Sequence, residues 1–448
     1  MVGRESIEKA LAEALATVRG AEADIVAVDT EIRLARFSNN EIHQNSVLSD
    51  TDFTVRVARG QKVGMIKTNR VSELKDAVRK AYDVAGLLPD SPIFAGLPEP
   101  AEYRKVNAFS KDTGDFSSYQ MADAAHEAIK RAEAAKVTAG GTVRTSILGT
   151  QVMSTKGVKA YNLSSTAQYK VVAMSDAWGT GLSNGAAVSV KDIDFGAVAA
   201  IAVDKCLRSA DPEPLEAGEY EAVLEPNAVS TMLNVLAMCG IDGMMYHEGN
   251  SFATGRMGRL VTNPMVSIAD DGLAPDTVQM PFDYEGVPRR KVEIIRSGVM
   301  SGMLFDSSSA KLEGTESTGH AMMPGAKFAD QAMHLRLAPG DSDVESMIRA
   351  TKKGILITRF HYVNPIHRVK TMFTGMTKDG TFLIENGKVT RPLRNLRFTD
   401  SILDGVLKNV ELIGRKTELF STDVTLPEGY VVPAIKTAKF NFTGSTDH

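Results

Sequence analysis

The sequence predicts an α+β protein in two parts: a mixed α/β N-terminal domain over residues 1–215 and an antiparallel β-rich C-terminal domain over residues 216–448. Length is the first reason, because 448 residues exceed the size at which a single hydrophobic core stops growing. The second reason is that helical and alternating apolar patterns succeed one another before residue 216, whereas alternating patterns dominate after it. The balance of 43% apolar and 24% charged residues is that of an ordinary globular protein.

The first half begins with a helical stripe of apolar residues over positions 7–18. Three runs with a period of two follow and predict strands at 23–30, 52–59 and 62–68. Gly60 separates the last two as a hairpin turn, and the helical period returns over residues 71–86. The proline-rich segment 87–106 is expected to be an extended connector over the surface.

A similar plan follows the connector. A helix is predicted over residues 117–135, strands at 142–155, 158–177 and 179–190, and a further helix over 195–210. An order of helix, strands and helix at an offset of roughly 115 to 120 residues is consistent with an internal structural repeat. A single α+β domain with an ordinary succession of elements accounts for the same pattern, and the sequence leaves both interpretations open.

The second half is expected to consist of antiparallel sheets packed around few helices. After a short strand at 220–226, the segment 226–246 predicts the main helix, with Asn227 as its cap. Two later segments alternate about Ser297-Gly298 and about Asn386-Gly387, and both pairs are typical of hairpin turns.

Charge and cysteine content exclude several classes of protein. The net charge of −4 supplies no basic field for nonspecific binding to nucleic acid, so no nucleic-acid partner is expected. Cys206 and Cys239 lie in apolar helical patterns, which favours a reducing, cytoplasmic location. Residues 1–20 carry charges throughout and no apolar run approaches eighteen residues, so neither a signal peptide nor a membrane span is expected.

Several motifs in both halves resemble the TldD/PmbA family, also called the modulator of DNA gyrase family. They are, in chain order, RLARFSNNEIHQNSVLSDTDFTVRVARGQKVGM, FATGRMGRLVTNPMVSIADDG, FDYEG, STGHA and IENGKVTRP. The resemblance covers nearly the whole chain, and it implies the same two-part fold and a relation to metallopeptidases.

In the TldD branch, the resemblance implies a His-Glu-xxx-His zinc motif on the helix over 226–246 and a cysteine ligand near the C-terminus. Here Asp242 is the only anionic side chain of that segment, and no cysteine follows Cys239. The chain therefore resembles more closely the PmbA (TldE) branch, the partner that lacks zinc ligands and completes the substrate channel. No cofactor is expected on this chain, and zinc is expected in a TldD-type partner.

The leading hypothesis is a non-metal subunit of a cytoplasmic TldD/TldE-type peptidase that acts on unfolded peptides. Such a chain would pair with a TldD-like subunit, with itself as a homodimer, or with both, and a free sheet edge could add an extended peptide as another strand. Two alternatives remain open. One is a stand-alone metallopeptidase with an atypical metal site, and the other is a regulatory binding protein without proteolytic activity.

No catalytic residue is assigned on this chain, and the resemblance supplies candidates for the substrate cleft. They are Asn40, His43, Gln44, Arg256, Asp283, Glu285 and His320. Support of turns is the alternative role for each of them. We favour that role for Asp283 and Glu285, because carboxylates in such turns accept backbone N–H bonds, and a cleft role for His320 and Arg256.

A metal site on this chain would require an unusual set of ligands. The candidates for such a set are His247, His361 and His367. His247 begins a His-Glu pair that lacks a second imidazole four or five positions later, which favours a histidine at a helix end. His361 and His367 are separated by Pro365 and could converge only through loop geometry.

Overall fold

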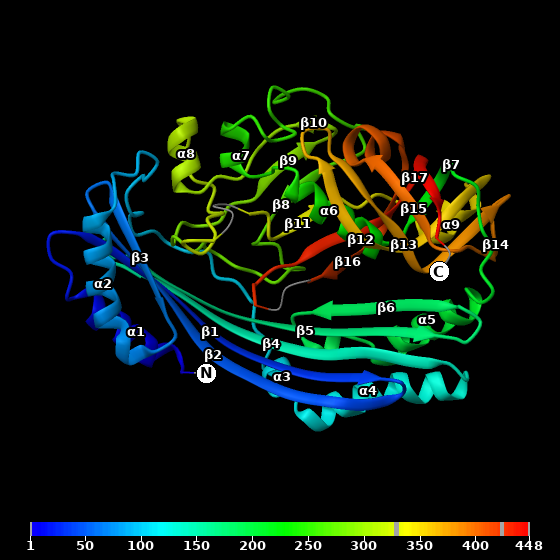
Figure 1. Ribbon diagram of the computed structural model, residues 1–448, viewed down its shortest axis with the longest axis horizontal. Helices are drawn as coiled ribbons and strands as arrows, with labels where there is room; N and C mark the ends of the chain where they lie inside the picture. Colours follow the sequence, from blue (N-terminus) through cyan, green and yellow to red (C-terminus); the bar gives the residue numbers. More distant parts are fainter. Residues whose placement is uncertain (1, 327–330, 422–424, 447–448) are drawn as a thin grey trace.

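The computed structural model describes residues 2–326, 331–421 and 425–446, and within them the chain forms two sheets (Figure 1). The first sheet has the order β3-β2-β1-β4-β5-β6, and every neighbouring pair is antiparallel. Its strands are β1 (Glu22–Ser38), β2 (Glu41–Arg59), β3 (Lys62–Thr68), β4 (Thr138–Ser154), β5 (Lys159–Met174) and β6 (Thr180–Ala187). Its helices are α1 (Arg4–Leu15), α2 (Leu74–Leu87), α3 (Lys111–Gly114), α4 (Ser118–Ala134) and α5 (Phe195–Arg208). Short 3-10 turns lie at Val71–Glu73 and Val190–Asp192.

The structure has the internal repeat of element order, which was one of the two interpretations that the sequence left open. The unit of helix, three strands and helix occurs first as α1-β1-β2-β3-α2 and again as α4-β4-β5-β6-α5, and the two units meet where β1 pairs with β4. Two glycines show the same packing in both units. A Cβ on Gly64 of β3 would lie 2.1 Å from the Ala81 carbonyl oxygen of α2, and one on Gly181 of β6 would lie 2.1 Å from the Ala202 carbonyl oxygen of α5.

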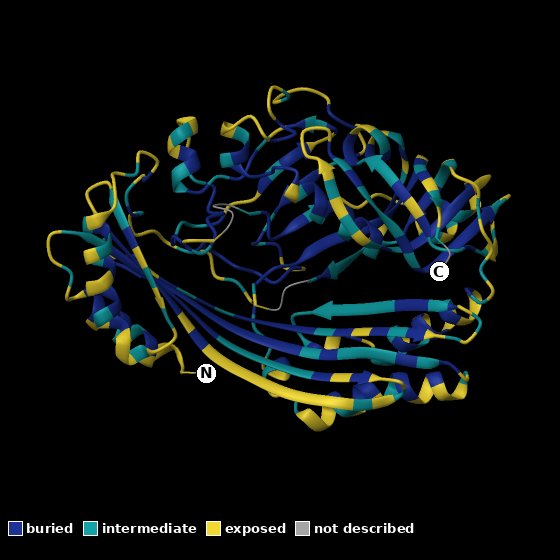
Figure 2. Cartoon of the chain, viewed as in Figure 1, coloured by how far each residue is buried: buried dark blue, intermediate teal, exposed yellow. Residues whose placement is uncertain are grey.

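Strands β1 and β2 are longer than their alternating patterns predicted. Residues 43–50 of β2 are exposed on both faces, so this part of the strand has no apolar alternation to detect (Figure 2). Helices α1, α2 and α4 lie on the face of the sheet that is turned away from the second half of the chain (Figure 1). On the other face, Val26, Val28 and Leu148 pack against Phe282 and Met333 of the second half.

The second sheet is mostly antiparallel, as predicted, with two parallel pairings, β7 with β12 and β11 with β17. An additional pairing of β17 with β7 closes a ring of strands in the order β7-β12-β13-β15-β17. The strands are β7 (Gly218–Leu224), β8 (Ile268–Asp270), β9 (Val292–Arg296), β10 (Val299–Met300), β11 (Leu335–Leu337), β12 (Lys353–His367), β13 (Met372–Glu385), β14 (Lys388–Pro392), β15 (Leu396–Ser401), β16 (Val410–Phe420) and β17 (Tyr430–Ser445). The helices are α6 (Pro226–Met238), α7 (Gly243–His247), α8 (Ser307–Glu313) and α9 (Val344–Arg349), with a π-helical turn at Ile402–Val406 and a 3-10 turn at Leu407–Asn409.

The predicted helix over 226–246 is two helices, α6 and α7. The prediction that Asn227 caps it is wrong. Glu225 is the N-cap residue of α6 and Pro226 occupies the first turn, where its missing N–H costs nothing. Asn227 instead donates a hydrogen bond from Nδ2 to Asn184 Oδ1 at 2.7 Å. The chain leaves the helix because Gly240 adopts a φ of 106°, and the Asp242 side chain then caps α7.

Both predicted hairpins are confirmed. Ser297-Gly298 connects β9 to β10, and Asn386-Gly387 connects β13 to β14, with positive φ at all four positions. In the described part of the chain, none of the helices is both long enough and apolar enough to cross a bilayer.

Candidate functional site

Helix α6, where the resemblance places the zinc motif of the TldD branch, is packed into the main core. Val229, Leu233 and Leu236 are completely or almost completely buried, and its thirteen residues include neither histidine nor glutamate. Among the described residues, no group of three or more His, Cys, Asp or Glu side chains is arranged to hold a metal ion. The described residues of this chain therefore do not fit a zinc site.

The three histidines proposed as an unusual ligand set do not come together in the described structure. His247 is the last residue of α7, and its Nδ1 lies 2.7 Å from Glu313 Oε1. His361 lies on β12, where burial and then the nearby charge of Lys378 lower the pKa of its imidazole. His367, at the exposed end of β12, accepts a bond from the Lys370 backbone N–H.

A buried charge network joins the two halves of the chain at Glu285. Asp24 of β1 and Arg56 of β2 are paired across the strands, and the guanidinium donates to both Asp24 oxygens at 2.9 Å. Arg56 Nη1 also donates to Glu285 Oε1 at 3.0 Å, and Glu285 Oε2 accepts from the Ser307 backbone N–H. Burial alone would lower the pKa of Arg56, but the two carboxylates outweigh it and raise the pKa, so the guanidinium is charged.

Asp283 organises the turn that carries Glu285. Its Oδ1 accepts the backbone N–H groups of Glu285 and Val287, and its Oδ2 accepts that of Ala321. Burial and then the nearby Glu285 carboxylate raise the pKa of Asp283 to about 7. These bonds are the turn chemistry that we favoured for Asp283.

His320 lies in a second buried polar cluster, which is next to this turn in space because the following residue, Ala321, bonds to Asp283. Its Nδ1 is 2.9 Å from Thr318 Oγ1, and its Nε2 is 3.1 Å from Asp270 Oδ1. Asp270 Oδ2 also accepts the His334 backbone N–H at 2.8 Å. Burial lowers the pKa of both imidazoles, to about 4 for His334. The His320 side chain is 0% exposed in this chain, and its role in a cleft stays a prediction.

The N-terminal candidates lie at the far end of the first sheet. Asn40 occupies the β1–β2 hairpin with a φ of 61°, and its side chain bonds Val137 and Ala139 at the start of β4. This arrangement supports the turn. His43 and Gln44 are exposed on the outer part of β2.

Arg256 belongs neither to the cluster around Glu285 nor to the cluster around His320. Its guanidinium is 3.6 Å from the Asp404 carboxylate at a partly exposed position. Its role in a cleft stays a prediction. The fold thus brings Asp283, Glu285 and the His320 segment together, and it places Arg256 and the β2 residues elsewhere.

A cavity of about 430 Å³ lies beside the Arg56–Glu285 pair, between the two halves of the chain. Met65 and Met322 line it together with those two charged residues. Since Arg56 and Glu285 are engaged with each other, they form a fixed polar wall and not a free acid and base. Sequence reasoning missed Arg56, because only the packing of the second half on the first sheet turns this strand position into a buried one.

Comparisons with known proteins agree with the fold. Residues 217–444 match the family model described as the PmbA/TldA metallopeptidase C-terminal domain, and residues 23–85 match PmbA/TldA metallopeptidase domain 1. A metalloprotease TldD homolog from Haemophilus influenzae is 28% identical over 54% of this chain and 51% of its own length. A metalloprotease TldD homolog from Buchnera aphidicola is 23% identical over 84% of this chain and 81% of its own length.

Among solved structures, TldE from Thermococcus kodakarensis has a similar fold. It superposes with a TM-score of 0.88 at 19% identity, over 98% of this chain and 100% of the other. The family matches cover the segments whose motifs suggested the resemblance, and the first one alone spans more than half of the chain. The chain therefore belongs to the PmbA/TldD metallopeptidase family.

Proposed function

We propose that this chain is the subunit without zinc ligands in a two-subunit peptidase of the TldD/TldE type. The observation that carries the proposal is the composition of α6, which has neither histidine nor glutamate and buries its apolar side chains in the core. A catalytic zinc needs neutral imidazoles and a carboxylate that takes a proton from its water. A TldD-like partner would supply those groups.

The contribution of this chain would be to hold an extended peptide. Among the described strands, β3 pairs with residues 53–59 of β2 and no further, so the outer part of β2 has a described neighbour on one side alone. Val47 and Leu48 lie there, exposed by 58% and 57%. An unpaired strand edge can bind an unfolded peptide through main-chain hydrogen bonds, which tolerate many sequences. His43 and Gln44 would then lie beside the bound peptide.

The test is reconstitution with a TldD-like chain encoded in the same genome. We expect the two proteins to elute together, zinc to be found with the TldD-like chain, and cleavage of an unfolded protein to require both and to stop with a chelator. Each protein alone is the control.

Two results would contradict the proposal. Near one equivalent of zinc in this chain alone, with chelator-sensitive cleavage, would identify a stand-alone peptidase. Recovery of an unrelated target, without any TldD-like chain and without cleavage, would identify a regulatory binding protein.

A further inference from the structure

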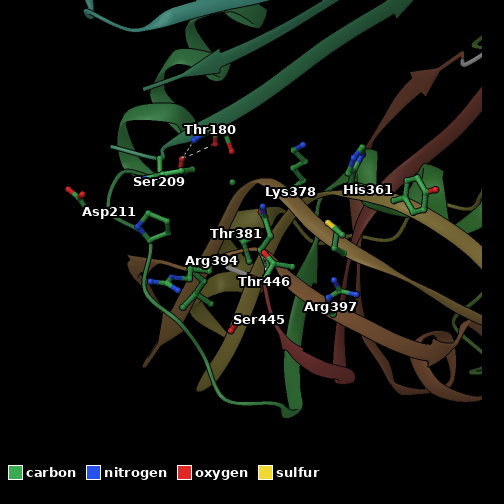
Figure 3. Close-up of a pocket in the computed structure, with 17 residues that line it drawn as sticks. Thr180, Ser209, Asp211, His361, Lys378, Thr381, Arg394, Arg397, Ser445 and Thr446 are labelled. Atoms are coloured by element: carbon green, nitrogen blue, oxygen red, sulfur yellow. Dashed lines mark hydrogen bonds between the residues drawn. The ribbon is translucent and has the colours of Figure 1, made fainter. Parts of the chain in front are cut away.

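A cavity of about 860 Å³ lies between the two halves of the chain, away from the Arg56–Glu285 pair (Figure 3). One wall comes from the first half, with Trp178 in the turn before β6 and Thr180 at its start. The other wall comes from the second sheet, with Lys378 on β13 and Arg397 on β15. Its volume is within the range of small-ligand sites, about 300–1,000 Å³.

The charges on the second wall are not balanced. In the described part of the chain, the side chains of Lys378, Arg394 and Arg397 have no carboxylate partner. Asp211 is the one carboxylate among the described residues that line the cavity. The neighbouring Asp379 is paired with Arg359 and does not offset these cations. An anionic ligand would supply the counter-charge that these cations lack.

Unusual backbone conformations gather at the same place. Trp178, Asp211 and Tyr362 line the cavity with φ values of 62°, 52° and 53°. The left-handed region is unfavourable for bulky side chains and costs on the order of 1–3 kcal/mol. The register of β12 with β13 also shifts beside Lys378, where Gly380 has a φ of 113°. Such bulges often redirect a side chain beside a functional site.

We propose that this cavity binds an acidic segment of an extended peptide, with its carboxylates against Lys378, Arg394 and Arg397 and its apolar part against Trp178. This inference rests on the proposed function, since it names the class of peptide that the subunit would select. Guanidinium groups bind carboxylates through paired hydrogen bonds. A nucleic acid is a poorer fit, because it requires a basic stripe and the chain carries a net charge of −4.

The chain contains its own reporter for this site. Trp178 is the single tryptophan of the sequence and is 71% exposed. We would titrate the isolated full chain with an acetylated, amidated tetraglutamate peptide and follow tryptophan fluorescence, with calorimetry in parallel. We expect a saturable change that weakens with added salt, and no change with the matched tetraglutamine peptide.

Substitutions in the cavity test whether the peptide binds there. We expect Lys378→Gln, Arg394→Gln and Arg397→Gln each to weaken binding by about 5-fold, and Lys130→Gln, a cation on the exposed side of α4, to change nothing. Circular dichroism identifies any variant that fails to fold, and the other variants then carry the test.

Equal binding of the tetraglutamine peptide, or unchanged affinity in all folded cavity variants, would overturn the proposal. Tighter binding of inorganic phosphate or a single-stranded oligonucleotide at this site would overturn the peptide assignment. The titration needs neither a partner nor cleavage. A failed reconstitution with a TldD-like chain and a failed titration are therefore separate results.

Discussion

Arg56 of β2 and Glu285 of the second half form a buried ion pair, with Nη1 3.0 Å from Oε1, between residues 229 positions apart in the chain. The pair is part of a network, because Asp24 holds the other side of the guanidinium. This network links the first sheet to the C-terminal half of the chain. Its loss would affect the contact between the two halves.

We expect Arg56→Met to destabilise the protein by about 3–5 kcal/mol, because it leaves Asp24 and Glu285 buried without a counter-charge. The measurement is urea unfolding followed by circular dichroism. The matched control is Lys75→Met, which breaks an exposed pair with Glu13 and is expected to have a much smaller effect, because water screens that pair. Equal effects of the two substitutions would contradict a structural role for the buried network.

Gly64→Ala and Gly181→Ala test the packing that the two repeat units share. The added methyl group would overlap the backbone of α2 or α5, and overpacking of this kind costs about 1–3 kcal/mol. Gly140→Ala in β4 is the control, since its Cβ would meet other atoms at ordinary contact distances. Thermal unfolding midpoints of the three variants provide the comparison. A midpoint for Gly181→Ala equal to that of the control would show that the helix can move away without cost.

The Ser117 hydroxyl caps α4 in a reciprocal arrangement with Gln120. We expect Ser117→Ala to cost about 1 kcal/mol, because the Gln120 backbone N–H loses its acceptor. Ser118→Ala, at the next and exposed position, should change the free energy of unfolding by less than this. Both values come from urea unfolding, and an equal loss in the two variants would contradict the capping role.

The raised pKa of Asp283 predicts that the stability of the protein depends on pH. Its folded-state pKa is about 7 against an ordinary value of 3.8, so between these values the unfolded chain releases a proton that the folded chain keeps. The contribution of Asp283 is complete below about pH 4 and is lost as the pH rises through about 7. We expect the free energy of unfolding to fall less steeply over this range in Asp283→Asn.

Asp123→Asn, which changes an exposed carboxyl on α4, provides the baseline for the pH series. The quantity to compare is the difference in unfolding free energy between wild type and each variant at each pH. A difference for Asp283→Asn that stays constant or grows with pH would contradict the raised pKa.

The open edge of β2 can be tested in the reconstituted peptidase. We expect Val47→Lys combined with Leu48→Lys to raise the KM for an unfolded substrate with little change in kcat, because edge lysines oppose the addition of another strand. Tyr119→Lys places a charge on another exposed hydrophobic residue, on α4, and is the control. An unchanged KM in the double variant would exclude this edge as the peptide site.

The sequence predicted those turns and helix ends that are set by residues next to them in the chain. The Asn386-Gly387 turn formed because both residues tolerate positive φ, and the helix after Ser117 began where its capping residues stand. The order of the family motifs along the chain was likewise sufficient for the family. The helix break at Gly240 was missed because the apolar pattern continues through it, while the backbone turns there against Ser251.

The sequence by itself determined the fold class, the hairpins and the family, because each depends on neighbouring residues or on motif order. Only the tertiary structure decided that β17 pairs with β7, that Arg56 meets Glu285, and that Lys378, Arg397 and Trp178 line one cavity. These contacts join segments that are far apart in the chain. Their energies come from burial and charge pairing, which no local pattern encodes.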